Sequence, residues 1–368
     1  MSTPQLFISA GDPSGDNATS HVVETLKKMT PGLTVFGLGG PKLKALGQEQ
    51  MADSADLAVL GFWEVVKRFP YFRNLLDRCE REIAARKPSC IMLVDYPGFN
   101  LRLAKRVRRL GIPIVYYISP QIWAWGKRRI ADIKELVDLM IVILPFEQEF
   151  YRSHGVRAEF VGHYLLEDIP SEYIRSPIPN SGTIALLPGS RPQEIERMLT
   201  PMLETAAAFN HKFGTKAIVA ALRNGYDYNQ TASAFAGHNI EISSEDSRRI
   251  LFESDLVLTA SGTATLEAGI IGRPMVIVYK TGFVTYQIAR RLVKIDKIGL
   301  VNLVLGEKVV PELIQGEANG AGMGAALTRY HEEVSYRTGV KERLDTVAGL
   351  LGGVGASGRA ARLVAKYL

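Results

Sequence analysis

Short apolar runs alternate with longer amphipathic stretches along the whole chain. In the first half the apolar runs predict strands at residues 5–9, 33–37, 90–95, 114–118, 139–144 and 158–161. The stretches between them predict helices, most clearly over residues 17–28, 100–110 and 145–154. Strands that alternate with helices favour an α/β fold built on parallel sheets.

The same alternation restarts in the second half, with strands predicted at residues 184–187, 216–221, 240–243, 256–260 and 274–279. Between the halves, residues 169–180 contain three prolines and lose the periodicity, so we predict a linker there. A chain of 368 residues is long enough for two domains with separate cores. We expect these domains over residues 1–167 and 181–345, followed by a C-terminal segment over residues 346–368 that ends in a helix.

Composition indicates a soluble globular protein, with 46% hydrophobic and 22% charged residues. The first residues lack the basic and apolar regions of a signal peptide, and no uncharged apolar stretch reaches the length of an ordinary transmembrane helix. The two cysteines, Cys79 and Cys90, offer neither a metal cluster nor a disulfide framework. The reducing cytosol is therefore the expected compartment.

The net charge of +6 is unevenly spread, since residues 60–130 hold 15 Lys and Arg against 5 Asp and Glu. A basic region can meet nucleic acid, anionic lipid or a phosphorylated substrate, and it can also be a solvated face. Within it, residues 60–76 mix aromatic side chains with cations, a pattern that suits a segment at a membrane interface. A buried amphipathic helix with a cationic outer face is the alternative.

Two turns in the second half have the form of phosphate-binding turns. The strand at 256–260 runs into a small, hydroxyl-rich turn over residues 261–265 and then into a helical stretch, which aims backbone N–H groups at one point. The strand at 183–187 ends in Pro-Gly-Ser-Arg, where Gly189 permits close approach and Arg191 can bind phosphate oxygens. Together they favour a nucleotide pocket at the carboxyl ends of parallel strands, although each alone is also an ordinary strand–helix turn. Neither is a dinucleotide-binding glycine motif or a P-loop.

The first half contains a similar glycine-rich turn over residues 11–16. Ser14 and the following helix N-terminus could hold an anion, whereas Asp12 and Asp16 fit better as acceptors for sugar hydroxyls or as helix caps. Asp95 ends a strand and could act as a general base toward a hydroxyl nucleophile, or could only initiate a turn. Asn100, five residues later, either caps the next helix or binds a substrate.

An unusual turn follows the strand at 114–118, with Gln121 and two tryptophans ahead of three consecutive cations. Tryptophan faces often pack on sugar rings, and arginines can pair with phosphate. Trp123 and Trp125 could equally serve interdomain packing. Two doubly wound domains joined by a linker leave a cleft between their strand ends, which is the usual place for a ligand.

These segments together resemble the lipid-A-disaccharide synthase family of glycosyltransferases. The matching stretches keep the family's order and lie at residues 9–16, 36–41, 60–65, 95–100, 118–125, 144–147, 161–163, 186–191, 260–267, 301–303 and 311–315. The resemblance implies a GT-B fold, in which two doubly wound Rossmann-like domains face each other across a cleft. It also implies that the last helix returns to the first domain.

The resemblance implies an inverting transfer of 2,3-diacylglucosamine from UDP to 2,3-diacylglucosamine 1-phosphate. The product would be the β-1,6-linked lipid A disaccharide 1-phosphate, with UDP released and with no metal or other cofactor. Such substrates imply a peripheral enzyme at the anionic cytoplasmic face of the inner membrane, with no nucleic acid as partner, and they leave a homo-oligomer open. The alternative is another GT-B UDP-sugar transferase, or a UDP-sugar epimerase.

The family's site residues carry over to matching positions of this sequence. Asp95 would be the general base. The acceptor would be bound by Ser14, Gly15, Asp16, Asn100 and Gln121. The UDP diphosphate would be held by Gly189, Ser190, Arg191, Ser261, Gly262, Thr263, Ala264 and Thr265. Glu267 would meet the ribose, and Asn302 and Gln315 would close the donor site.

Three positions depart from the family pattern. The family's Glu-Ala in the first turn is Asp12-Pro13 here, its second aspartate after Asp95 is Gly98, and its proline after Val-Gly-His is Tyr164. All three departures fall on the acceptor side.

Overall fold

The computed structural model describes residues 3–57, 69–123, 129–223, 225–282 and 297–368. The chain divides into two compact units. Unit 1 consists of Met1–Tyr164 with Gly352–Leu368, and unit 2 consists of Leu165–Leu351. In the described part of the chain no helix is long and apolar enough to cross a membrane.

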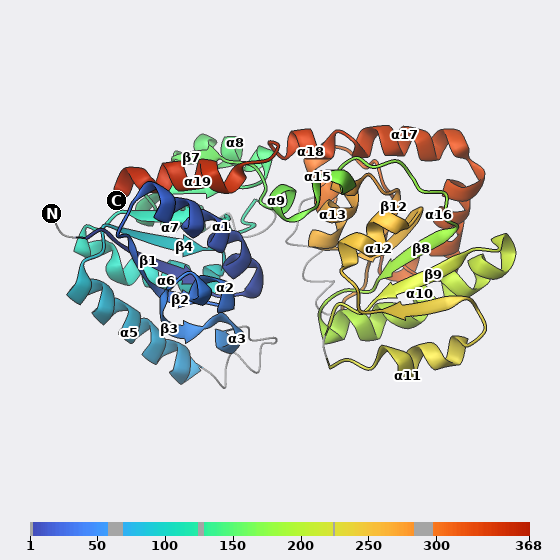
Figure 1. The fold of residues 1–368 in the computed structure, drawn as a ribbon, viewed down its shortest axis with the longest axis horizontal. Helices are drawn as coiled ribbons and strands as arrows, with labels where there is room; N and C mark the ends of the chain where they lie inside the picture. Colours follow the sequence, from blue (N-terminus) through green and yellow to red (C-terminus); the bar gives the residue numbers. More distant parts are fainter. Residues whose placement is uncertain (1–2, 58–68, 124–128, 224, 283–296) are drawn as a thin grey trace. The chain divides into compact units, whose positions relative to one another are not determined.

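Unit 1 is built on a parallel sheet of seven strands in the order β3-β2-β1-β4-β5-β6-β7 (Figure 1). The strands are β1 (Gln5–Ala10), β2 (Thr34–Gly39), β3 (Glu49–Asp53), β4 (Cys90–Val94), β5 (Ile114–Tyr117), β6 (Leu139–Val142) and β7 (Ala158–Phe160). The strand order runs outward in both directions from the β1/β4 pair. In open α/β sheets such a reversal is the point where ligands bind, beyond the carboxyl ends of the strands.

The helices of unit 1 are α1 (Pro13–Met29), α2 (Pro41–Ala45), α3 (Ser54–Leu57), α5 (Phe69–Arg86), α6 (Pro97–Val107), α7 (Arg129–Leu136), α8 (Pro145–Ser153) and α19 (Ala356–Val364). One core cluster joins apolar side chains of α5, α6 and α7 to those on one face of the strands, such as Phe7, Leu93 and Met140. The last helix, α19, lies beside α1 and buries Ala360 and Val364 (Figure 1). The end of the chain is therefore part of unit 1.

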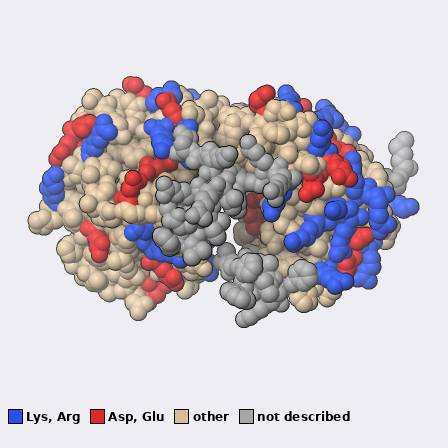
Figure 2. Space-filling model, turned by 180° about the vertical axis from the view of Figure 1, so that it is seen from behind, with Lys and Arg blue, Asp and Glu red and all other residues tan. Residues whose placement is uncertain are grey.

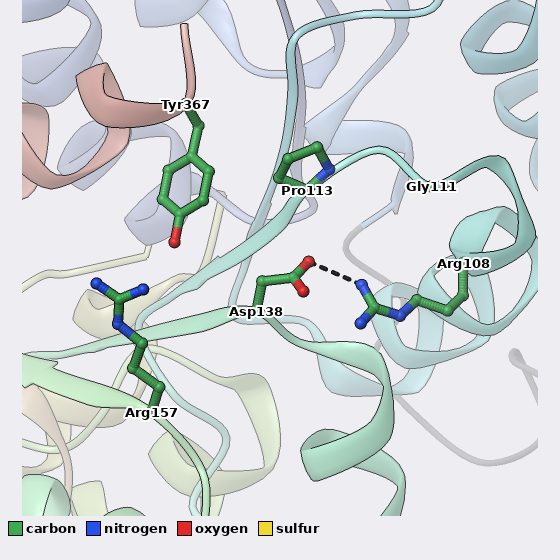
Figure 3. A pocket seen from close by; sticks show the side chains of 6 residues that line it. All are labelled: Arg108, Gly111, Pro113, Asp138, Arg157 and Tyr367. Atoms are coloured by element: carbon green, nitrogen blue, oxygen red, sulfur yellow. Dashed lines mark hydrogen bonds and ion pairs between the residues drawn. The ribbon is translucent and has the colours of Figure 1, made fainter.

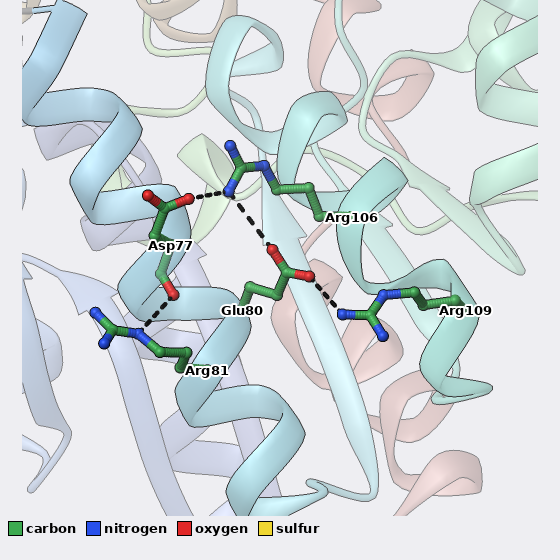
Figure 4. A network of polar contacts seen from close by, with 5 residues as sticks. All are labelled: Asp77, Glu80, Arg81, Arg106 and Arg109. Atoms are coloured by element: carbon green, nitrogen blue, oxygen red, sulfur yellow. Dashed lines mark hydrogen bonds and ion pairs between the residues drawn. The ribbon is translucent and has the colours of Figure 1, made fainter.

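Ion pairs connect α5 and α6 at the surface (Figure 4). Arg106 pairs with Asp77 and Glu80, and Arg109 pairs with Glu80 at 2.7 Å. Arg81 donates to the backbone carbonyl of Asp77 at 3.3 Å. Exposed ion pairs contribute only about 0–1 kcal/mol each, so the apolar contacts beneath them determine how the two helices pack.

Unit 2 is built on a parallel sheet of six strands in the order β10-β9-β8-β11-β12-β13. The strands are β8 (Thr183–Leu187), β9 (Lys216–Ala220), β10 (Ile240–Ser243), β11 (Leu256–Ala260), β12 (Met275–Tyr279) and β13 (Glu312–Ile314). The order reverses between β8 and β11, so the carboxyl ends of these two strands form the switch point of unit 2.

Helices cover both faces of this sheet. Its helices are α9 (Leu165–Asp168), α10 (Pro192–Phe213), α11 (Tyr228–Ala232), α12 (Ser247–Glu253), α13 (Thr263–Ile271), α15 (Leu300–Leu305), α16 (Gly320–Glu332), α17 (Val334–Leu344) and α18 (Val347–Leu350). The helices α10 and α16 pack together, and α13 packs against α12, α15 and α18. Helices on both faces of a parallel sheet make each unit doubly wound, as predicted.

The proline-rich segment at residues 169–180 is fastened to unit 2 by a buried arginine. Arg273 is fully buried, and its guanidinium donates to the carbonyl and hydroxyl oxygens of Ser176 at 3.0 and 2.8 Å. It also donates to the carbonyls of Leu251 and Phe252 at 3.0 and 2.8 Å. One side chain thus ties this segment to α12.

The predicted strands are confirmed, and two short strands at sheet edges were missed. In β3 the sequence is Glu-Gln-Met-Ala-Asp, and β13 has three residues, so neither carries an apolar run. The first helix was predicted to begin at residue 17 but begins at Pro13, because Asp12 caps its N-terminus and proline suits the first helical position.

Candidate functional site

Asp95 lies directly beyond the carboxyl end of β4, at the switch point of unit 1. Asp95 and Tyr96 both have left-handed backbone conformations, with φ of 41° and 47°. Such a conformation costs a non-glycine residue about 1–3 kcal/mol, so two in succession require support from their surroundings. This local strain coincides with the position predicted for the base.

Two buried donors hold this turn through the carbonyl of Asp95. The hydroxyl of Tyr116 donates to it at 2.5 Å, and the side-chain amide of Asn100 donates to it at 2.7 Å. Asn100 also donates to the carbonyl of Val94 at 3.0 Å and accepts from the hydroxyl of Ser9 at 2.6 Å. Asn100 is fully buried, so the structure places it beneath the turn; a direct contact with an acceptor stays a prediction.

Asp12 follows β1 and lies near Asp95 across the switch point. Burial and, to a smaller extent, the negative charge of Asp12 together raise the pKa of Asp95 to about 6. Burial also raises the pKa of Asp12, whose Oδ1 accepts from the amide of Gly15 at 2.6 Å. A carboxylate whose pKa lies near 6 is mostly ionised at neutral pH and suits a general base.

The glycine at position 11 allows the two loops to meet. A Cβ added there would lie only 2.4 Å from Cδ1 of Tyr96, so the tyrosine ring occupies the space that a side chain would need. The hydroxyl of Tyr96 donates to the carbonyl of Leu57 at 3.0 Å. Any larger residue at position 11 would displace the turn that carries Asp95.

The other residues of the first glycine-rich turn differ in their exposure to solvent. Ser14 is exposed at the start of α1. Gly15 is buried and holds Asp12 through its amide. Asp16 is 2% exposed, and its carboxylate accepts from the amides of Gly40, Lys42 and Leu43 at 2.7, 3.0 and 3.2 Å. In this structure Asp16 therefore caps α2, and its predicted role in binding an acceptor stays a prediction.

Glu147 supports the turn that contains Gln121, and sequence reasoning assigned it no role. Its carboxylate accepts from the hydroxyl of Ser119 at 2.6 Å, the indole of Trp123 at 3.1 Å and the amide of Leu144 at 3.0 Å. Burial raises the pKa of Glu147 to about 7. Gln121 itself is exposed. Trp125 and the cations at 127 and 128, which were also predicted to act here, lie outside the described residues, as does the part of the proposed membrane segment at 60–68.

In unit 2 the turn after β8 has the conformation that its glycine predicts. Gly189 has φ of 111°, and a Cβ there would lie 2.7 Å from a carboxylate oxygen of Glu194. Arg191 is well exposed, and its guanidinium pairs with Glu194 at 2.8 Å. Arg223, beyond β9, donates to the carbonyl of Ser190 at 3.5 Å. The structure thus places Glu194 and Arg223 at this turn, and the sequence motif did not indicate either residue.

The turn after β11 lies next to the turn after β8 at the switch point, and it leads into α13. Gly262 is the N-cap residue, and Thr265 is buried, with its hydroxyl bonded to the carbonyl of Gly262 at 2.8 Å. The hydroxyl of Ser261 donates to the carbonyl of Ile298 at 3.0 Å. Thr263 and Ala264 occupy the first turn of α13, where backbone N–H groups have no partner inside the helix. The structure therefore brings both predicted phosphate turns to one switch point.

Glu267, in the second turn of α13, forms an ion pair. Its carboxylate accepts from Nε of Arg248 at 2.9 Å, and Arg248 also donates to the carbonyl of Asp168 at 3.1 Å. Burial raises the pKa of Glu267, and the charge of Arg248 opposes that shift. The predicted contact of Glu267 with a ribose stays a prediction.

Asn302 and Gln315 hold loops of unit 2 in place. Asn302 is fully buried, donates to the carbonyl of Val310 at 2.9 Å and accepts from its amide at 3.1 Å. Gln315 exchanges two hydrogen bonds of 3.1 Å with the backbone of Thr281, next to residues 283–296, which the structure does not describe. Their predicted contacts with the donor stay predictions.

The structure shows the surroundings of two positions that depart from the family pattern, Gly98 and Tyr164. A Cβ built at Gly98 would meet no atom within 4 Å, so the loss of the family's aspartate is not forced by packing. Tyr164 stacks on His163, with ring centroids 4.8 Å apart.

A surface cavity of about 480 Å³ lies at the opposite edge of the unit 1 sheet, where β5, β6 and β7 begin (Figure 3). Asp138 in its wall accepts from Arg108 and from the amide of Ile114, each at 2.8 Å. The cavity contains none of the residues at the switch point. Among the described residues, no group of three or more His, Cys, Asp and Glu side chains is arranged to hold a metal ion.

The fold is shared with proteins of known structure. A putative UDP-N-acetylglucosamine 2-epimerase from Listeria monocytogenes superposes with a TM-score of 0.68 at 14% identity, covering 98% of this chain and 95% of that one. CalG4, the calicheamicin glycosyltransferase, superposes with a TM-score of 0.64 at 18% identity, covering 100% and 99%. At these identities the likeness shows the fold alone, and it confirms the predicted GT-B class.

Sequence comparison identifies the family. The family profile described as "Lipid-A-disaccharide synthetase" matches residues 6–351. The lipid-A-disaccharide synthase of Anaeromyxobacter dehalogenans (strain 2CP-1) is 41% identical over 371 residues, covering 98% of this chain and 97% of that protein. That of Myxococcus xanthus is 38% identical over 374 residues, covering 99% and 98%. The chain therefore belongs to the lipid-A-disaccharide synthase family.

Proposed function

We propose that the chain transfers 2,3-diacylglucosamine from UDP to the 6-hydroxyl of 2,3-diacylglucosamine 1-phosphate. The observation that carries this proposal is the placement of Asp95 at the switch point of unit 1, in a chain of this family. The two phosphate-type turns at the switch point of unit 2 support a donor site for UDP.

The proposed transfer is a single displacement with inversion. Asp95 accepts the proton of the acceptor hydroxyl as its oxygen bonds to the anomeric carbon of the donor sugar. The bond from that carbon to the diphosphate breaks on the opposite side, and UDP leaves with the electron pair. The first-turn amides of α13 and the guanidinium of Arg191 would stabilise the negative charge on the leaving diphosphate.

Arg191 needs to reorient in this scheme, since its guanidinium is paired with Glu194 at 2.8 Å. The pair is exposed and therefore weak, so a diphosphate can compete for the arginine. Glu267 would accept a ribose hydroxyl while its ion pair with Arg248 keeps it ionised. Asn302 and Gln315 would close the donor site through the loops they hold.

The acceptor would meet unit 1. Ser14 and Gln121 are exposed and could bind it directly, whereas Gly15, Asp16 and Asn100 would act through the turns that they support. Trp123, held by Glu147, could pack on a sugar ring.

We also propose that unit 1 binds an anionic membrane surface from the cytoplasmic side. Lys and Arg side chains predominate over part of its surface (Figure 2), and exposed cations on α5 and α6 include Arg73, Arg102 and Lys105. Acyl chains keep the substrates in the bilayer, so cations near the headgroups would favour binding. Co-sedimentation with anionic vesicles, and none with neutral ones, is the expected result; equal binding to both would contradict it.

The test of the function is a coupled assay. The protein is given UDP-2,3-diacylglucosamine and 2,3-diacylglucosamine 1-phosphate in detergent micelles, and UDP release and product mass are measured. A disaccharide 1-phosphate of the expected mass supports the proposal. A UDP-linked sugar of unchanged mass but altered configuration would indicate an epimerase, and the absence of UDP binding would overturn the donor site.

The pH dependence of this reaction should depend on Asp12. In Asp12→Asn the negative charge facing Asp95 is removed, so the pKa of Asp95 should fall from about 6. Because the base is active when ionised, the acid limb of the rate profile should move to lower pH. Asparagine still accepts the amide of Gly15, so the cap of α1 is retained. An unmoved acid limb would show that Asp12 does not act on the titrating group.

A further inference from the structure

The turn that carries Asp95 is held by β5 on both sides of the residue. The amide of Asp95 donates to the carbonyl of Tyr117 at 3.0 Å, which continues the pairing between β4 and β5. Its carbonyl accepts from the hydroxyl of Tyr116 at 2.5 Å. Two neighbouring residues of one strand therefore bind both the amide and the carbonyl of Asp95.

Tyr116 is suited to act only as a donor here. It is fully buried, and burial together with the charge of Asp95 raises the pKa of its hydroxyl well above the usual value. Tyr151 and Arg129 are the other charged or titratable groups that affect this hydroxyl. The phenol thus stays protonated, and its proton is directed to the carbonyl of Asp95.

The second donor is fixed by a separate contact. The carbonyl oxygen of the Asn100 side chain accepts from Ser9, so its NH₂ group must face the carbonyl of Asp95. Together the two donors satisfy a carbonyl that would otherwise be turned inward without a partner. They offset the strain of the left-handed pair Asp95 and Tyr96.

We infer that Tyr116 is a positioning residue for the general base, acting through the carbonyl of Asp95 to hold the carboxylate in its reactive place. The inference rests on the proposed function, since it assigns Tyr116 a role in that reaction. Misplacement of a reacting group by about 1 Å can cost about 100-fold in rate. One lost donor, with Asn100 still in place, should cost less than that.

The test is Tyr116→Phe, which removes a single oxygen atom. The rate constant kcat for UDP release should fall about tenfold, while the Kd for UDP and the KM for the donor stay unchanged. In the Asp95→Asn background the same substitution should cause no further loss, because the base through which it acts is absent. An equal loss in both backgrounds, or no loss in either, would overturn the inference.

A matched control is Tyr330→Phe in unit 2. Tyr330 is also fully buried, and its hydroxyl donates to a strand carbonyl, that of Met275, at 3.1 Å. Both variants lose one buried hydrogen bond, so both should lose similar stability, but only Tyr116→Phe should lower kcat. Equal kcat values in the two variants would show that Tyr116 is merely structural.

A second readout does not depend on turnover. The ¹³C resonance of the Asp95 carboxyl reports the midpoint of its titration. This midpoint should shift in Tyr116→Phe, because the carboxyl moves relative to Asp12, and it should not shift in Tyr330→Phe. If the wild-type chain released no UDP from the proposed substrates, the proposed function would fail, and this titration would still decide the inference. An unshifted midpoint in Tyr116→Phe would overturn it.

Discussion

Replacing Asp95 with asparagine is expected to lower the rate of UDP release by about 10²- to 10⁴-fold. Asparagine has nearly the same shape, so the backbone contacts of the turn with Tyr116 and Asn100 remain. Its neutral amide cannot take the proton of the acceptor hydroxyl. The measurement is single-turnover UDP release at saturating acceptor, with UDP affinity measured in parallel.

UDP affinity should be unchanged in this variant, because the proposed diphosphate groups belong to unit 2. A suitable control is Asp77→Asn, which removes an aspartate from the surface ion pairs of α5 and α6 (Figure 4). The control should retain the wild-type rate. If Asp95→Asn kept a rate within a few-fold of wild type, another group would have to be the base.

The second large effect is expected on stability. Arg273→Met should lower the free energy of unfolding of unit 2 by about 3–5 kcal/mol. Arg273 is fully buried, and its loss removes the guanidinium donor from the carbonyls of Ser176, Leu251 and Phe252. Burial lowers the pKa of Arg273 to about 10, so the guanidinium is still charged at neutral pH.

Urea denaturation followed by far-UV circular dichroism measures this loss, because the three tryptophans of the chain all lie outside unit 2 and tryptophan fluorescence would not report its unfolding. The control is Arg329→Met on α16, where the guanidinium is exposed and pairs with Glu333 at 3.1 Å. That variant should lose at most about 1 kcal/mol. A loss as small in Arg273→Met would show that the carbonyls find other partners. Faster proteolysis within residues 169–180 should accompany the loss, since Arg273 holds Ser176.

The position of the candidate site within each sheet could be predicted because it follows from the strand pattern. Asp95 and the turns after β8 and β11 directly follow apolar runs, and the carboxyl ends of parallel strands share one edge of a sheet. The chain order of strands does not show which ones are neighbours. That β1 pairs with β4, which places Asp12 beside Asp95, became visible only with the sheet order.

The hydrogen-bond partners of several polar residues could not be predicted for a related reason. Asp16, Asn100 and Asn302 belong to family motifs and were expected at the ligand; in the structure each is buried and bonded to backbone groups, and their contacts with a ligand stay predictions. Glu147 and Tyr116 were given no role, although they hold the turns around the predicted acceptor site. A sequence motif shows that a polar group is present but not whether it faces a ligand or supports the turn that does.

The amino-acid sequence by itself determined the α/β class, most of the strands, the family and the turns that carry the candidate chemistry. These depend on hydrophobic periodicity and on local turn residues, which act over a few positions along the chain. Only the tertiary structure decided the partners of the buried polar groups, such as Ser176 for Arg273 and Ser9 for Asn100. A hydrogen bond requires two atoms within about 3 Å, and packing alone brings together groups that are distant in sequence.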